Sequence, residues 1–367
     1  MRVLLAGGGT AGHVFPAIAL AERLQGHHAV TVEFVGSPQG QEARLVPIAG
    51  FAFHGVAAEQ MPRTVSAEAL RAPFTALVSV RACRPIVARA DVVVGMGGYA
   101  SLPAVLAARW MKKPLVLHEQ NVVPGIVNRL ASRWAKTIAV SFVDSIPRFA
   151  SRANRTVVTG NPVREQILRV SERREALAKE ACAELDLDPD VPTVLVAGGS
   201  LGALALDWLV AEAILLLEGR EDLQVLALTG PGHLADVQRA ASSVAAPRVR
   251  ALEFLDRIEL AYAVADLALA RAGANTVTEL AVCGVPSLLV PYPHATENHQ
   301  EANARELERA GAATVALESS LTPRVLASSL TSLLADEESR RRMGAAGLAW
   351  ARPDAAAHLA RVVVEAA

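Results

Sequence analysis

The sequence contains few cysteines, and they lie far apart. Only three occur among 367 residues, at Cys83, Cys182 and Cys283, and none belongs to a C-x-x-C pair. This spacing predicts neither a disulfide framework nor a zinc knuckle, and it is typical of a reduced, intracellular protein.

Long apolar runs are also missing. No stretch of about 20 residues is free of glycine, proline and charge, so the sequence predicts no membrane-spanning helix. The opening run Met1 to Ala6 leads directly into glycines and is too short for the core of a signal peptide. We expect it to form a first β-strand.

The whole chain has almost no excess charge. Its 36 Lys and Arg against 37 Asp and Glu give a formal net charge of −1, which argues against a strongly basic nucleic-acid-binding protein. The halves differ, because residues 1–165 contain 18 basic and 9 acidic side chains, whereas residues 166–367 contain 18 and 28. The first half therefore suits an anionic partner, although uneven charge on solvated helices would give the same counts.

A metal-binding motif is not evident. The run Asp186-Leu187-Asp188-Pro189-Asp190 resembles an acidic metal loop, but it lacks the glycine and the later glutamate of a calcium loop. We interpret it as a solvated turn, and we predict no metal site and no cofactor.

Short apolar runs rich in Val, Leu and Ile recur along the chain, each followed by a segment of helical character. Such runs are typical of strands buried on both faces, and their alternation with helices predicts an α/β protein with parallel sheets. The runs are 2–6, 30–35, 91–95, 114–118, 137–141, 193–197, 223–229, 265–269 and 286–290.

A weak internal repeat divides the chain. Residues 3–12 and 194–202 both read as a strand, a glycine turn and a helix start, so each opens its own doubly wound domain. We place the boundary after the Gly-Asn-Pro-Val run that ends at Val163, which gives domains 1–163 and 164–352. Pro353 ends a helical stretch, and residues 353–367 contain a last amphipathic helix.

Asparagine is scarce, and most asparagines lie at positions where parallel-sheet proteins bind ligands. Parallel sheets bind ligands beyond the carboxyl ends of their strands, although asparagine also favours ordinary turns. Of seven asparagines, five lie at predicted strand ends or in polar loops: Asn121, Asn161, Asn275, Asn298 and Asn303.

The first glycine loop matches G-x-G-x-x-G through Gly7, Gly9 and Gly12, a pattern that lets a backbone approach an anionic group. A nicotinamide enzyme needs an acidic residue at the end of the second strand, but here that strand ends in Val-Gly-Ser, which weakens the dinucleotide interpretation. His13 follows the loop and is a candidate base; the alternative is that it only packs at the helix start.

The second glycine loop, residues 198–202, also fits the G-x-S-x-G nucleophile elbow of a hydrolase, with Glu279 and His294 or His299 as triad partners. A second complete glycine-loop domain argues against that hypothesis. Alternatively, Ser200 and nearby N–H groups hold a phosphate at a helix N-terminus.

A third helix start lies at residues 271–279. Glu279 in its first turn could accept the hydroxyls of a ribose, or Thr276 and Glu279 could form only a capping box.

Apolar side chains ringed by cations in the first half predict docking on an anionic membrane, with core packing as the alternative. The apolar residues include Leu70, Phe74 and Trp110, and the cations include five arginines between Arg63 and Arg89 together with Lys112 and Lys113.

Seven ordered motifs resemble the MurG family, the peptidoglycan N-acetylglucosaminyltransferases of the GT-B superfamily. The resemblance extends from about residue 5 to about residue 310. The motifs are 8–13, 97–99, 118–121, 160–164, 198–203, 273–279 and 298–304.

This resemblance implies a GT-B fold of two Rossmann-like domains facing a cleft, no metal, and a last helix that packs on the first domain. It implies inverting transfer of GlcNAc from UDP-GlcNAc to the 4-hydroxyl of undecaprenyl-pyrophosphoryl-MurNAc-pentapeptide, on the cytoplasmic face of the plasma (inner) membrane. Ala11 and Ala272 stand where many members have Gly and Ser.

The resemblance also implies a role for individual residues. Ser200 and Arg164 would face the diphosphate, the backbone around Leu255 the uracil, and Glu279 the ribose. Gln300 and Asn121 would face the sugar, with Asn303 as a further substrate-binding residue. The pyrophosphate would lie at Ala274, Asn275, Thr276, Val277 and Thr278, and Thr10, Ala11 and Gly12 would approach the donor.

His13 is the first candidate for the catalytic base and Glu119 the second. Three alternatives remain at this point: a diacylglycerol glycosyltransferase, a UDP-GlcNAc epimerase, and a UDP-sugar-binding module without transfer activity.

Overall fold

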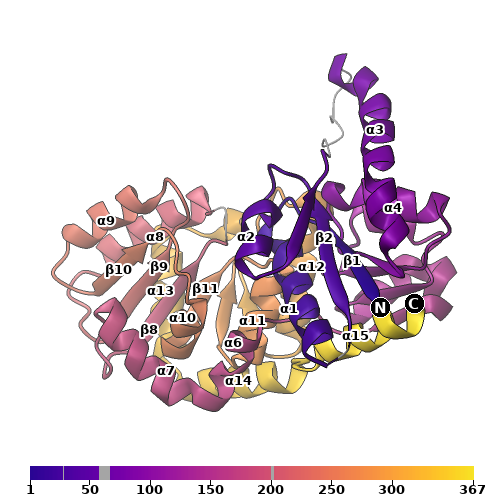
Figure 1. Ribbon diagram of the computed structural model, residues 1–367. Helices are drawn as coiled ribbons and strands as arrows, with labels where there is room; N and C mark the ends of the chain where they lie inside the picture. The colour runs from indigo at the N-terminus through magenta and orange to yellow at the C-terminus, as the bar shows by residue number, and fades with distance from the viewer. Residues whose placement is uncertain (28, 58–66, 200–201) are drawn as a thin grey trace. The chain divides into compact units, whose positions relative to one another are not determined.

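The chain forms two α/β units in a computed structural model that describes residues 1–27, 29–57, 67–199 and 202–367 (Figure 1). The first unit comprises Met1–Arg164 together with Arg352–Ala367, and the second comprises Glu165–Ala351. Each has one parallel sheet with helices on its faces, so the prediction of two doubly wound parallel-sheet domains is confirmed.

The first unit contains a seven-stranded sheet in the order β3-β2-β1-β4-β5-β6-β7. Its strands are β1 (Arg2–Ala6), β2 (Thr31–Gly36), β3 (Ala52–Gly55), β4 (Val92–Gly95), β5 (Leu115–Glu119), β6 (Thr137–Val140) and β7 (Thr156–Val158). Its helices are α1 (Ala11–His27), α2 (Glu42–Ile48), α3 (Ala67–Arg89), α4 (Leu102–Trp110), α5 (Ile126–Ala131) and α15 (Ala355–Ala366), with short 3-10 segments η1 (Tyr99–Ser101) and η2 (Val143–Arg155).

Both faces of this sheet are covered. In β1, Val3 and Leu5 pack on the face covered by α1 and α15, whereas Leu4 and Ala6 pack on the face covered by α3 and α4. Strands buried on both sides need apolar residues at every position, which explains the unalternating runs in the sequence.

The last helix belongs to the first unit. Leu359 and Val363 of α15 are buried in the same core as Val3 and Leu5, and Lys136 Nζ donates to the Ala366 carbonyl at 2.9 Å. Where the chain enters this helix, Gly160 lies so close that a Cβ there would be 2.9 Å from the Ala355 side chain. The final segment thus completes one face of the first sheet.

The second unit contains a six-stranded sheet in the order β10-β9-β8-β11-β12-β13. Its strands are β8 (Thr193–Ala197), β9 (Gln224–Leu228), β10 (Arg248–Leu252), β11 (Ala265–Ala270), β12 (Ser287–Leu289) and β13 (Ala313–Val315). Its helices are α6 (Glu165–Leu168), α7 (Val170–Leu185), α8 (Leu204–Leu216), α9 (Leu234–Ser242), α10 (Ile258–Val264), α11 (Ala274–Val282), α12 (His299–Arg309), α13 (Pro323–Ala335) and α14 (Glu337–Trp350), with 3-10 turns η3 (Thr296–Asn298) and η4 (Glu318–Ser320).

Strand order reverses at one point in each sheet, between β1 and β4 in the first unit and between β8 and β11 in the second. The loops that leave these strands diverge to opposite faces, and the crevice between them is the usual ligand position in such sheets. All three glycine-containing helix starts found in the sequence lie at these points.

Candidate active site

The first glycine loop is held by a buried carboxylate that sequence analysis did not identify. Glu42, the first residue of α2, accepts hydrogen bonds from the backbone N–H groups of Gly9 and Ser37, each at 2.8 Å. A Cβ on Gly8 or Gly40 would lie within 2.2 Å of this carboxylate, so only glycine fits there. The acidic group near the end of β2 therefore binds the protein's own backbone, which leaves the nicotinamide interpretation without its ribose acceptor.

The His13 side chain lies beside two glycines. It is the third residue of α1, and its ring packs against Gly97 and Gly98, where a Cβ would approach ring atoms to 3.2 and 3.1 Å. Both glycines have positive φ, 86° and 73°, which other residues adopt only with strain. The Nδ1 atom of His13 is 3.0 Å from Oε1 of Gln120, directly after β5.

Glu119, the second candidate base, is buried and already accepts four hydrogen bonds. Its Oε1 accepts from the backbone N–H and the side-chain amide of Asn121, at 3.0 and 3.4 Å. Its Oε2 accepts from the Gly125 N–H at 3.0 Å and from Asn128 Nδ2 at 2.9 Å. These bonds tie β5 to the start of α5, so the carboxylate orders the loop that contains Asn121. Asn128 was not identified from the sequence.

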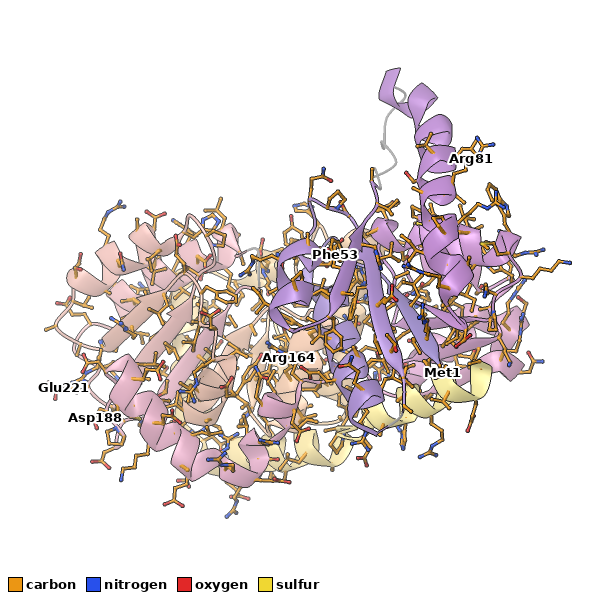
Figure 2. The ribbon with its side chains drawn as sticks, viewed as in Figure 1. Met1, Phe53, Arg81, Arg164, Asp188 and Glu221 are labelled. Carbon is orange, nitrogen blue, oxygen red and sulfur yellow. The ribbon has the colours of Figure 1, made fainter. Side chains whose placement is uncertain are left out.

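The other first-unit candidates surround the start of α1. Thr10 and Gly12 are exposed and Ala11 is buried, and the Thr10 carbonyl accepts from the His13 N–H at 3.1 Å. The Arg164 guanidinium stacks on the Phe15 ring, 3.9 Å from its centroid. Figure 2 shows Arg164 among the side chains near α1. An aromatic face attracts a cation, so Phe15 helps to position the Arg164 guanidinium.

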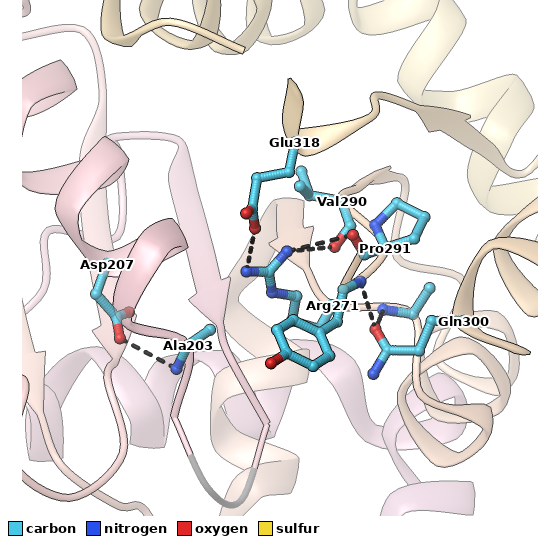
Figure 3. A network of polar contacts seen from close by, with 9 residues as sticks. Ala203, Asp207, Arg271, Val290, Pro291, Gln300 and Glu318 are labelled. Atoms are coloured by element: carbon cyan, nitrogen blue, oxygen red, sulfur yellow. Dashed lines mark hydrogen bonds and ion pairs between the residues drawn. The ribbon is translucent and has the colours of Figure 1, made fainter. Parts of the chain in front are cut away.

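In the second unit, Ser200 lies outside the described residues, whereas Gly199 before it and Gly202 after it are described. Gly202 has φ of 75°, and a Cβ there would lie 2.5 Å from the Thr229 carbonyl oxygen. At the helix start, the Ala203 N–H donates to Asp207 Oδ2 at 3.3 Å (Figure 3). Burial raises the pKa of Asp207 to about 6.

The capping-box hypothesis for α11 is wrong. The helix starts at Ala274 with Gly273 as its N-cap, so Thr276 already lies inside the helix and Glu279 lies in its second turn. Glu279 is buried, and its Oε2 accepts from the Tyr262 hydroxyl at 2.7 Å. Of the histidines in the hydrolase hypothesis, His299 contacts the Thr296 carbonyl through Nδ1 at 2.8 Å.

The predicted pyrophosphate segment divides into two parts. Val277 and Thr278 are buried, and the Thr278 hydroxyl donates to the Ala274 carbonyl at 2.8 Å. Asn275 and Thr276 are half-buried in the first turn, where N–H groups precede the first intrahelical bond, from Val277 to Gly273. Any anion held here must therefore contact first-turn N–H groups rather than the Thr278 hydroxyl.

Two side chains of α12 position the loop before α11. Gln300 Oε1 accepts from the N–H groups of Ala272 and Tyr292, at 3.2 and 2.9 Å (Figure 3). Asn303 Nδ2 donates to the Ala272 carbonyl at 3.2 Å, and Asn303 is fully buried. Asn303 thus positions the loop, while the Gln300 amide nitrogen is a donor that a ligand can use.

Arg271 is a further residue to which the sequence analysis assigned no role. Its buried guanidinium donates to the Val290 and Pro291 carbonyls at 3.2 and 3.3 Å and pairs with Glu318 at 2.5 Å (Figure 3). These bonds connect the ends of β11 and β12 to η4, and they hold in place the residue that leads into the α11 N-terminus. The uracil candidate Leu255 is half-buried in the loop between β10 and α10.

The predicted membrane residues are only partly described. The side chains of Leu70 and Phe74 lie outside the described residues, although both positions belong to α3. Trp110, at the end of α4, is 56% exposed, and Lys112 is exposed beside it. Lys113 differs, because its Nζ donates to the Ala90 carbonyl at 2.7 Å. This bond holds the Lys113 side chain against the end of α3, and its membrane role stays a prediction.

Two features are absent from the residues that the structure describes. Within residues 1–27, 29–57, 67–199 and 202–367, no group of three His, Cys, Asp or Glu side chains could hold a metal ion. In the same ranges, no helix is both long and apolar enough to cross a membrane.

Comparison with known proteins matches both halves of the chain to one family. The glycosyltransferase family 28 N-terminal domain matches residues 3–140, and its C-terminal domain matches residues 193–359. A relative from Nocardioides sp. is 42% identical over 368 residues, which cover 100% of this chain and 98% of the relative. It is named UDP-N-acetylglucosamine--N-acetylmuramyl-(pentapeptide) pyrophosphoryl-undecaprenol N-acetylglucosamine transferase.

Two solved structures share the fold of the whole chain. The crystal structure of MurG from Acinetobacter baumannii has a TM-score of 0.77 and 31% identity and covers 99% of each chain. A UDP-GlcNAc 2-epimerase from Neisseria meningitidis, bound to UDP-GlcNAc, has a TM-score of 0.74 over 100% of both chains but only 16% identity. The second likeness shows the fold alone.

Glu42 gives a first testable prediction. Glu42→Gln replaces one acceptor oxygen by an amide that cannot accept from Gly9 or Ser37, and a buried unsatisfied N–H costs about 1–3 kcal/mol. We expect unfolding free energy to fall by that amount and the Gly9 and Ser37 amides to exchange faster with deuterium. Arg44→Ala, on the exposed side of the same helix, is the control; equal exchange in both variants would contradict the role of Glu42.

Proposed function

The chain belongs to the MurG family of N-acetylglucosaminyltransferases, within glycosyltransferase family 28, and from this premise we propose how it acts. It transfers GlcNAc from UDP-GlcNAc to the 4-hydroxyl of the muramyl unit of undecaprenyl-pyrophosphoryl-MurNAc-pentapeptide, which forms the lipid-linked disaccharide precursor of peptidoglycan. The observation that carries this proposal is the full-length identity of 42% to a transferase of that name.

The reaction needs a base for the acceptor hydroxyl, and His13 is the better of the two candidates. The four hydrogen bonds to Glu119 use both of its oxygens, so it would have to break structural bonds to take a proton. His13 makes one bond, through Nδ1, and within the part of the chain that the structure describes no group hydrogen-bonds to its Nε2. An unengaged imidazole nitrogen is suited to accept a proton near neutral pH.

The reaction also needs stabilisation of the departing UDP. The helix N-termini of α8 and α11 offer backbone N–H groups and the positive end of the helix dipole to a diphosphate. Arg164, whose guanidinium stacks on Phe15, is a further proposed partner for the diphosphate. We propose that these groups replace a metal ion in the transfer step.

We propose that two side chains of the second unit, Gln300 and Glu279, bind the donor sugar and the ribose. The Gln300 carbonyl oxygen is occupied by two backbone N–H groups, so its amide nitrogen would donate to a sugar hydroxyl. Glu279 would accept from the ribose hydroxyls while Tyr262 holds its second oxygen. A carboxylate oriented by a buried tyrosine meets a diol at a fixed angle, which favours a ribose over a deoxyribose.

We further propose that the protein binds the cytoplasmic face of the plasma (inner) membrane. The exposed apolar side chains Leu77, Val78 and Trp110 lie on α3 and α4, which pack together through Val80, Cys83 and Ala107. Arg81 extends outward from α3 (Figure 2), and Lys112 is exposed at the end of α4. Apolar side chains among cations suit an anionic lipid surface.

One assay separates this function from its alternatives. The protein is incubated in EDTA with labelled UDP-GlcNAc and either the lipid-linked muramyl-pentapeptide, diacylglycerol or no acceptor. We expect a labelled disaccharide lipid only with the muramyl acceptor, because the proposed chemistry needs no metal. A glycosylated diacylglycerol, an epimerised nucleotide sugar without acceptor, or a melting-temperature shift without UDP release would each favour the corresponding alternative.

Glu279 gives a prediction about donor binding. Glu279→Gln removes the charge that a ribose hydroxyl would meet, and a hydrogen bond to a charged group contributes about 1.5–3 kcal/mol. We expect UDP-GlcNAc to bind at least about tenfold more weakly by calorimetry. Tyr262→Phe is the matched variant, since it removes the buried partner but leaves both carboxylate oxygens. A ribose role is wrong if Glu279→Gln binds UDP-GlcNAc as tightly as the wild-type protein does.

The exposed apolar and basic side chains of α3 and α4 predict membrane binding. The double variant Trp110→Ala with Lys112→Ala should bind phosphatidylglycerol-containing vesicles about tenfold more weakly, because each basic residue near the surface contributes about 1 kcal/mol and Trp favours the interface. Trp208→Ala with Lys179→Ala removes an equally exposed Trp and Lys from the second unit. Equal binding by the two double variants in a sedimentation assay would remove this patch from the proposal.

A further inference from the structure

A line of hydrogen bonds runs inward from His13 through two buried side chains. His13 Nδ1 is 3.0 Å from Gln120 Oε1, and Gln120 Nε2 is 2.9 Å from His118 Nδ1. His118 Nε2 is in turn 3.1 Å from the Gly160 carbonyl oxygen. Gln120 is 1% exposed and His118 is fully buried. The line thus ends at the backbone, away from solvent.

The carbonyl oxygen of Met96 fixes the orientation of the Gln120 amide. Gln120 Nε2 is 3.0 Å from this oxygen. A carbonyl oxygen only accepts hydrogen bonds, so the amide atom that faces it must be the nitrogen. The other amide atom, which faces His13, is therefore the oxygen.

The carbonyl oxygen of Gly160 fixes the tautomer of His118 in the same way. His118 Nε2 must donate to it and therefore bears the hydrogen. The opposite nitrogen, Nδ1, is then the acceptor for the Gln120 amide, in agreement with the orientation set by Met96. Burial lowers the pKa of His118 to about 4, so the ring stays neutral near pH 7 and this pattern persists.

The two anchors together determine the protonation of His13. Since Gln120 presents only its oxygen to the His13 ring, Nδ1 of His13 must donate, and in the neutral ring the lone pair then lies on Nε2. The ring occupies space that side chains at Gly97 and Gly98 would fill, since a Cβ on either residue would lie 3.2 or 3.1 Å from a ring atom. Neutral imidazole side chains otherwise populate both tautomers, so the protein has to impose one of them.

We propose that Gln120 and His118 are positioning residues that hold His13 in its Nδ1–H tautomer, with Nε2 as the atom that removes the proton from the acceptor hydroxyl. This inference rests on the proposed function, in which His13 is the base. As the muramyl 4-oxygen bonds to C1 of GlcNAc, its proton moves to Nε2. The C1–oxygen bond to UDP breaks with its electron pair remaining on the diphosphate.

The same arrangement accommodates the product of that proton transfer. The imidazolium form of His13 has hydrogens on both nitrogens, and its Nδ1–H still donates to Gln120 Oε1. Neither the amide nor His118 has to reorient during the step. A preorganised partner of this kind lowers the reorganisation needed in the transition state.

Nuclear magnetic resonance tests the tautomer directly and without turnover. The full-length protein is labelled with ¹⁵N-histidine, and the His13 and His118 rings are assigned by the loss of their signals in His13→Gln and His118→Asn. At a pH where both rings are neutral, we expect His13 with its hydrogen on Nδ1 and His118 with its hydrogen on Nε2. A hydrogen on Nε2 of His13 would overturn the proposal.

Variants of Gln120 test its role in turnover. Gln120→Leu keeps the approximate volume but offers no acceptor, so we expect His13 to shift towards the Nε2–H tautomer. The kcat should fall by about 10²-fold, within the range of general-base contributions, with little change in the KM for UDP-GlcNAc. A merely structural role for Gln120 would instead leave the His13 tautomer unchanged in this variant.

The outcomes separate this inference from the proposed function. Absence of disaccharide product from the wild-type protein would refute the function and leave the tautomer measurement standing. An active wild type with His13 in the Nε2–H form would refute only the positioning role. If Gln120→Leu does not fold, as judged by circular dichroism, the tautomers of the wild-type protein still decide the question.

Discussion

The loops beyond the carboxyl ends of the strands depend on buried polar side chains that complete their hydrogen bonding. A loop that leaves a parallel sheet presents N–H and C=O groups that neither ladder nor helix pairs, and leaving them buried and unpaired is costly. Here Glu42 accepts hydrogen bonds from the N–H groups of Gly9 and Ser37. Glu119 accepts from those of Asn121 and Gly125. Gln300 accepts from those of Ala272 and Tyr292. The candidate ligand groups keep their positions because these bonds are made.

The sequence predicts the centre of each sheet better than its edges. The nine apolar runs correspond to β1, β2, β4, β5, β6, β8, β9, β11 and β12, because strands buried on both faces leave a continuous apolar signal. The strands β3, β7, β10 and β13 lie at the sheet edges, where shorter length and exposed positions remove that signal. Helix α11 was predicted in place, but its cap was misassigned, because the spacing of Thr276 and Glu279 carries no information on where the first turn begins.

The sequence shows candidate ligand groups more readily than the side chains that position them. His13 and Gln300 stand in recognisable motifs, whereas Glu42 acts on a loop 33 residues earlier and Gln120 faces a histidine 107 residues away. Such pairs exist only once the strands are ordered, so no local pattern indicates them. The one signal available for Glu42 was the set of surrounding glycines, since Gly8 and Gly40 leave the space that its carboxylate fills.

Charge explains why the partner of His13 is an amide rather than a carboxylate. Both substrates in the proposed reaction are diphosphate anions, so an unneutralised carboxylate beside His13 would oppose their approach. The two buried carboxylates near the first glycine loop, Glu42 and Glu119, are each surrounded by N–H donors. Gln120 orients the imidazole through one accepting oxygen and adds no charge. The imidazole can thus be directed at a hydroxyl without a negative charge beside it.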